Sequence, residues 1–123
     1  MTSLRKIILA PAAEEDIGAI LVWSAATFGD AARRRYAALI VQAISDLAES
    51  PKRAGVHERP EVGEGLCSYY LTHSRSHARL VAETVAAPRH FVIFRIRGNG
   101  GLEVVRILHD SMDLARPMAA GDE

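Results

Sequence analysis

Four side chains near the end of the chain could do chemistry on a phosphodiester. They are one histidine and three arginines: His109, Arg106, Arg95 and Arg97. Cleavage of RNA needs a base for the 2′-hydroxyl, an acid for the leaving group and a cation for the phosphate charge, and these residue types can supply all three. They lie on two predicted strands joined by a short turn, so they can be neighbours in space.

Side-chain alternation along the second of these strands argues against a compact site. Arg106 falls on one side with Val104, and His109 falls on the other with Ile107. The two therefore point to opposite faces unless the strand ends or bulges between them. The simpler interpretation, which we favour, bonds His109 to a local carboxylate such as Asp113 and places Arg106 in a structural ion pair.

Other reactive side chains are weaker candidates. His73 and His77 are four residues apart and could share a metal on a helix, but the sequence predicts a solvated basic loop there. Cys67 is the only cysteine, so no internal disulfide is possible, and we expect a small, partly buried thiol. No metal site and no cofactor are expected.

The elements that must position these groups follow from hydrophobic spacing and turn residues. Pro11 begins a helix after a strand over residues 4–10, and Gly29 ends that helix. Asp30 is predicted to cap a second helix, which stops before Pro51. The later segments are a loop over 51–65, a strand over 66–72, a long polar loop over 73–90, and strands over 91–97 and 102–109 around a turn at 98–101.

This order predicts one α+β domain over residues 1–118, followed by a flexible tail over 119–123. An N-terminal strand and an antiparallel helical hairpin precede a mainly antiparallel sheet of three to four strands. The predicted core stripe of the first helix is Ile17, Ile20, Leu21, Ser24 and Phe28, and that of the second is Ala32, Tyr36, Leu39, Ile40, Ala43 and Leu47.

Composition restricts the class of protein only loosely. Fifteen Lys and Arg balance fifteen Asp and Glu, so net charge does not predict nucleic-acid binding. Almost all the basic residues are Arg, which suits an acidic partner or RNA, although high genomic GC content produces the same bias. The apolar run before Pro11 is too short for a signal peptide and no segment is long enough to span a membrane, so we expect a cytoplasmic protein.

Three stretches of the sequence resemble the ParE/RelE toxin superfamily, in its ParE branch of plasmid-stabilisation proteins. They are the strand-to-helix entry at 9–17 (LAPAAEEDI), the helix end at 47–51 (LAESP) and the C-terminal signature at 105–116 (VRILHDSMDLAR). Together they cover residues 7 to 116 in the order and spacing of the family. The stretch over 73–89 is longer than the family's usual connection between the middle strands.

The resemblance implies a function. ParE-like toxins bind and block DNA gyrase, and a ParD-like antitoxin neutralises them. RelE-like relatives with the same fold cut messenger RNA on the ribosome, and membership does not decide between the two. The leading hypothesis is therefore an inhibitor that acts by binding. A ribosome-dependent endoribonuclease using His109, Arg106 and Arg95, and an inactive member that only binds its antitoxin, are the alternatives.

Two surfaces are candidates for these partners. The target-facing side is expected to comprise Arg95, Arg97, Arg106, His109, Asp113 and Arg116. Val22, Trp23 and Val41 fall off the core stripes of the helices, and both faces of the last hairpin carry apolar residues. We expect an antitoxin to cover this apolar surface and to contact Arg33 and Arg34 beside it.

Overall fold

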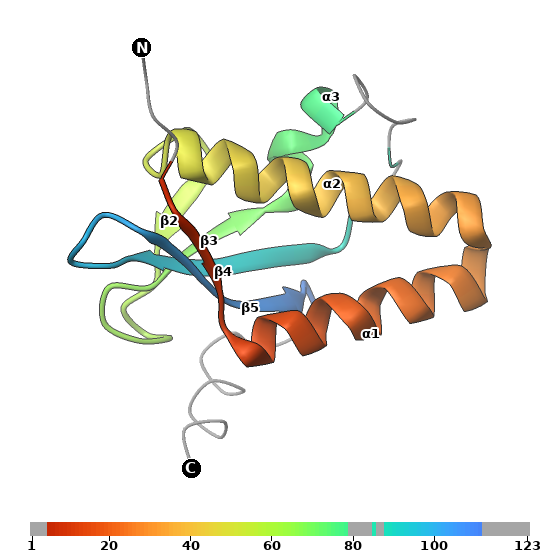
Figure 1. Ribbon diagram of the computed structural model, residues 1–123, viewed down its shortest axis with the longest axis horizontal. Helices are drawn as coiled ribbons and strands as arrows, with labels where there is room; N and C mark the ends of the chain where they lie inside the picture. The colour runs from red at the N-terminus through yellow and green to blue at the C-terminus, as the bar shows by residue number, and fades with distance from the viewer. Residues whose placement is uncertain (1–4, 79–84, 86–87, 112–123) are drawn as a thin grey trace.

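The chain folds into a helical hairpin packed on a five-stranded sheet (Figure 1). The computed structural model describes residues 5–78, 85 and 88–111. In chain order the elements are β1 (Ile7–Leu9), α1 (Pro11–Phe28), α2 (Asp30–Glu49), β2 (Val56–Glu58), β3 (Cys67–Tyr70), the 3₁₀ turn η1 (Leu71–Ser74), α3 (Arg75–Ala78), β4 (His90–Ile96) and β5 (Leu102–His109).

The helical hairpin is closed by a single residue. Pro11 opens α1, where its missing N–H costs nothing. Gly29 follows α1 with φ +96°, a conformation that favours glycine, and its N–H donates to the Ala25 carbonyl at 2.9 Å. The prediction that Asp30 caps α2 is wrong, because Gly29 holds the cap position and Asp30 is the first helical residue.

The sheet has the strand order β1-β5-β4-β3-β2. β1 runs parallel to β5, with Ile7 beside Leu102, and the other neighbours are antiparallel. This confirms the mainly antiparallel α+β fold. β2 was missed, since it lies within the segment that was predicted to be a loop.

A β-bulge interrupts the last hairpin. Ile93 pairs with Arg106 and Phe94 pairs with Val104, so Val105 has no partner on β4. A bulge inserts one residue and changes the direction in which the following side chains point. The simple alternation assumed for β5 therefore does not hold along its whole length.

The main core lies between the helices and one face of the sheet. Its largest fully buried side chains include Tyr69, Phe94 and Leu39. The predicted stripes are confirmed except at Phe28, which is 66% exposed and touches Trp23 edge-on, with ring centroids 5.5 Å apart. Phe28 lies in the last turn of α1, beyond the point where the helix covers the sheet (Figure 1).

A second cluster occupies the opposite face of the last hairpin. Ile93 and Leu108 are buried there beneath Val62 and Leu66, which lie in the loop between β2 and β3. Part of the apolar surface that the sequence left uncovered is thus covered by the chain itself.

The segment after β3 is helical at its start, where the sequence predicted a long loop. Residues 71–78 form η1 and α3, and the ring of His73 lies 5.5 Å from the ring of Tyr69. The remainder of that loop falls largely outside the described residues, as does the predicted tail over 119–123. No helix in the described part of the chain is long and apolar enough to cross a membrane.

Candidate functional site

A hollow of about 320 Å³ lies between α1 and the end of the sheet where β4 begins and β5 ends. We call it the histidine pocket, and it is lined by Ala19, Ile20, Trp23, His90 and His109. His90 and His109 are directly paired across β4 and β5, and their rings meet at 90° with centroids 5.2 Å apart. The sheet and α1 together therefore place two imidazoles and an indole around one small space.

His90 is held in a defined tautomer by Tyr36 of α2. The Tyr36 hydroxyl oxygen lies 2.6 Å from Nδ1 of His90 and accepts the backbone N–H of Arg89 at 3.0 Å. Burial lowers the pKa of His90 to about 4, with the nearby His109 adding to the effect, and raises the pKa of Tyr36 to about 12. At neutral pH both groups are uncharged, and since the phenol oxygen already accepts the Arg89 N–H, we assign its one hydrogen to the bond with Nδ1, which leaves the hydrogen of His90 on Nε2.

His90 lines the histidine pocket, and Nε2 is the ring nitrogen that does not contact Tyr36. His90 is only 5% exposed, and its Nε2 has no hydrogen-bond partner among the residues that the structure describes. No fully sealed side-chain nitrogen or oxygen in that part of the chain lacks a partner, so Nε2 is not sealed. His90 thus offers one proton donor to whatever enters the pocket.

His109 lies at the mouth of the same pocket. Its Nδ1 is 2.7 Å from the Ser111 hydroxyl, accepts the Ser111 backbone N–H at 3.1 Å and lies 3.5 Å from Asp110. Because Nδ1 accepts that N–H, its 3.5 Å approach to Asp110 is not the expected hydrogen bond to a carboxylate, and Asp113 lies outside the described residues.

Asp110 belongs to a clasp that fixes the strand ends beside the pocket. It receives two N–H groups of Arg89 at 2.9 to 3.1 Å and lies 2.8 Å from the Tyr70 hydroxyl. The bond from Arg89 lowers the pKa of Asp110, and the carboxylate in turn raises the pKa of Tyr70. The clasp ties β3, β4 and β5 together and positions the residues on either side of it.

Arg106 is engaged on another element. Its guanidinium forms two hydrogen bonds with Asp16 of α1, at 2.7 and 3.0 Å, and the same carboxylate accepts the backbone N–H of Ile107 at 2.9 Å. Pairing between β1 and β5 ends at Val104, and beyond that point the Asp16 carboxylate accepts a backbone N–H of β5 in place of a strand.

Arg95 and Arg97 lie at the far end of the hairpin from His109. Arg95 donates to Glu103 at 2.9 Å, and Arg97 lies 3.8 Å from the same carboxylate. His109 follows Glu103 by six positions along β5, which is roughly 20 Å along a strand. The structure therefore does not bring Arg95 and His109 together, and Arg116 lies outside the described residues.

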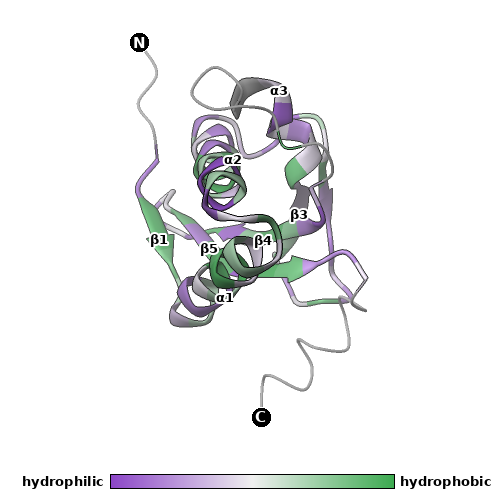
Figure 2. Ribbon diagram, turned by 90° about the vertical axis from the view of Figure 1, so that its right-hand side faces the viewer, coloured by the Kyte–Doolittle hydropathy of each residue, from purple (hydrophilic) through white to green (hydrophobic). Residues whose placement is uncertain are grey.

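The residues expected to face an antitoxin surround the helical hairpin. Val22 is 71% exposed, Trp23 48% and Val41 67%. Val22, Trp23 and Phe28 are the exposed large apolar side chains of α1, and we call them the apolar patch; the end of α1 nearest to them faces the viewer in Figure 2. At the start of α2, Arg33 and Arg34 share the single carboxylate of Asp30, at 2.8 and 3.2 Å.

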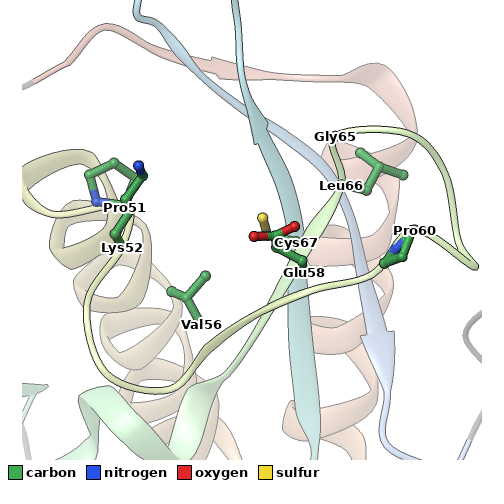
Figure 3. A pocket seen from close by; sticks show the side chains of 8 residues that line it. All are labelled: Pro51, Lys52, Val56, Glu58, Pro60, Gly65, Leu66 and Cys67. Atoms are coloured by element: carbon green, nitrogen blue, oxygen red, sulfur yellow. The ribbon is translucent and has the colours of Figure 1, made fainter.

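A second hollow, of about 390 Å³, lies at the β2 edge of the sheet (Figure 3). The side chains of Glu58 and Cys67 lie side by side at its centre, and these residues are paired across β2 and β3. Burial and the nearby Glu58 raise the pKa of the Cys67 thiol, so it stays protonated and is a poor nucleophile. This agrees with the prediction of an unreactive, partly buried cysteine.

Sequence reasoning missed His90 and Tyr36. They are 54 residues apart, and neither stands in a motif, so no local pattern links them. One indirect signal was available. Extending the predicted hairpin by one residue pairs His90 with His109 and so places two histidines side by side.

Comparison with known proteins agrees with this fold. Residues 7–114 match the family model of the ParE toxin of type II toxin–antitoxin systems, parDE. A solved structure of the chromosomal ParDE toxin–antitoxin system from P. aeruginosa matches with a TM-score of 0.61 and 16% sequence identity, over 86% of this chain and 96% of that one. A search of curated proteins finds no match. Because the family model spans most of the chain, the protein belongs to the ParE family of toxins of type II toxin–antitoxin systems.

Proposed function

We propose that this toxin inhibits DNA gyrase by binding and that a ParD-like antitoxin neutralises it. The observation that supports binding over catalysis is the state of the arginines that a nuclease would need. Arg106 is paired with Asp16 and Arg95 with Glu103, so both guanidinium groups already neutralise carboxylates of this chain. A phosphate-stabilising arginine must instead have its N–H groups available for the substrate.

The proposal is tested by incubating the purified chain separately with gyrase on relaxed plasmid and with a translating extract. Supercoiling is expected to stop while messenger RNA stays intact. Cleaved messenger RNA with unaffected supercoiling would overturn the proposal, and loss of that cleavage in His109→Ala would identify an endoribonuclease. An effect on neither would leave the chain as an antitoxin-binding member without a toxic activity of its own.

Charge reversal locates the target-facing side. Arg95→Glu together with Arg97→Glu changes the far end of the hairpin, where both side chains are about half exposed. If this end meets gyrase, the double variant loses inhibition, whereas the exposed Lys52→Glu, a reversal in the loop after α2, keeps it. Equal inhibition by all three proteins would exclude the Arg95 end as the contact surface.

A further inference from the structure

The histidine pocket has the size of a binding site for one side chain. Its volume of about 320 Å³ is at the lower limit of ligand pockets, which run from about 300 to 1,000 Å³. Its walls are mostly apolar, from Ala19, Ile20 and Trp23, and His90, whose Nε2 is not bonded to Tyr36, lines it as well. An occupant that fits has an apolar body and a hydrogen-bond acceptor near it.

The surroundings of the pocket favour a protein segment as its occupant. Trp23 lines the pocket and also belongs to the apolar patch, so pocket and patch form one continuous surface. Two arginines, Arg33 and Arg34, lie about one turn of α2 before Tyr36. Both pair with the single carboxylate of Asp30, so this end of α2 carries an excess of positive charge. A partner with apolar residues and an excess of acidic ones matches this surface in both polarity and charge.

We propose that the histidine pocket receives one apolar side chain of the antitoxin, while a backbone carbonyl next to that side chain accepts the Nε2–H of His90. Acidic residues of the same segment pair with Arg33 and Arg34. This inference rests on the proposed antitoxin partnership and names its anchor point. An occupant of the pocket also covers His109, one of the residues expected on the target-facing side, whereas Arg95 and Arg97 lie at the far end of the hairpin.

Filling the pocket from within the toxin tests the proposal. Ala19 is exposed and lines the pocket, so Ala19→Phe adds bulk there without entering the core. Ala12→Phe is the matched control, since Ala12 is exposed on the same stripe of α1 but roughly 10 Å away, outside the pocket. Thermal unfolding of both variants should match that of the wild type.

The probe is the purified product of the small gene adjacent to this one, titrated into each toxin variant by calorimetry. Losing a central anchor is expected to weaken binding by at least about thirty-fold in Ala19→Phe and by less than about threefold in Ala12→Phe. Unchanged affinity in Ala19→Phe overturns the proposal, as does an equal loss in both variants. If the toxin alone is a dimer that Ala19→Phe dissociates, the occupant is a second copy and the proposal is wrong.

A direct readout follows the donor itself. In toxin with ¹⁵N-labelled histidine, the Nε2–H signal of His90 should shift and exchange more slowly with water when the antitoxin product is added. An unmoved His90 signal in a saturated complex overturns the hydrogen bond. Because neither measurement uses gyrase, failure of gyrase inhibition and failure of this inference are observed separately.

Discussion

The buried pair of Tyr36 and His90 makes the stability of the toxin depend on pH over a defined range. In the unfolded chain a histidine titrates near 6.5, whereas in the fold the pKa of His90 is lowered to about 4. Between these values the unfolded chain binds a proton that the folded chain does not. The free energy of unfolding therefore falls as pH falls through this range. Above about pH 7 both states leave this histidine unprotonated, so it does not make the free energy of unfolding depend on pH.

The size of the effect follows from the difference between the two pKa values. One pKa unit corresponds to about 1.4 kcal/mol, so His90 accounts for about 2 kcal/mol lost by pH 5 and about 3 kcal/mol lost by pH 4. Paired carboxylates such as Asp110 also destabilise the fold in acid. That loss begins only as the unfolded chain binds protons near a carboxylate pKa of about 4, so the interval from 6.5 to 5 reports mainly on histidine.

Urea unfolding at half-unit steps from pH 7.5 to 5 measures this slope. His90→Asn is the matched variant, because its side-chain oxygen can still accept the Tyr36 hydroxyl but does not titrate. The wild type should lose about 2 kcal/mol more than the variant over this interval. Parallel pH profiles for the two proteins would refute the assignment of His90 as a neutral donor.

Further perturbations test other parts of the structure, each by urea unfolding. Asp16→Ala should cost roughly 2–3 kcal/mol, because it leaves the partly buried Arg106 and a backbone N–H of β5 without their acceptor; a loss below about 0.5 kcal/mol would contradict this. Gly100→Ala should cost about 1–2 kcal/mol from its φ of +87° alone, since the added methyl meets nothing, whereas Gly98→Ala, with no positive φ, should be near neutral. Gly55→Ala should cost more than Gly100→Ala, because its φ is +99° and the new Cβ would lie 2.6 Å from a histidine ring; equal losses would show that this ring moves aside.

The elements predicted well are those that local chemistry specifies. Pro11, Gly29 and the turn at 98–101 mark boundaries by backbone conformation, and the stripes of both helices follow from spacing alone. β2 was missed because three residues, one of them apolar, show no alternation, and it is a strand only by pairing with β3. Phe28 was predicted to lie in the core because the spacing of apolar residues along a helix does not show where the helix extends past the sheet that it covers.

The candidate site was harder to predict than the fold, since its contacts are between distant parts of the chain. Trp23 was recognised because it departs from its own helix's stripe. The Tyr36–His90 bond and the Arg106–Asp16 pair join residues 54 and 90 positions apart, which no single-sequence pattern encodes. The bulge at Val105 separates Arg106 from the face of Val104, but from Arg106 to His109 the pairing with β4 is regular, so these two residues still alternate onto opposite faces as predicted.

The parallel pairing of β1 with β5 has a consequence for the order in which the toxin can be assembled. Among the described residues the first strand pairs with the last one, and the partners Ile7 and Leu102 are 95 positions apart in the sequence. During synthesis the helical hairpin can form early, but β1 has no strand to join until β5 has left the ribosome. A nascent toxin therefore cannot complete this sheet until residues 102–109 have left the ribosome.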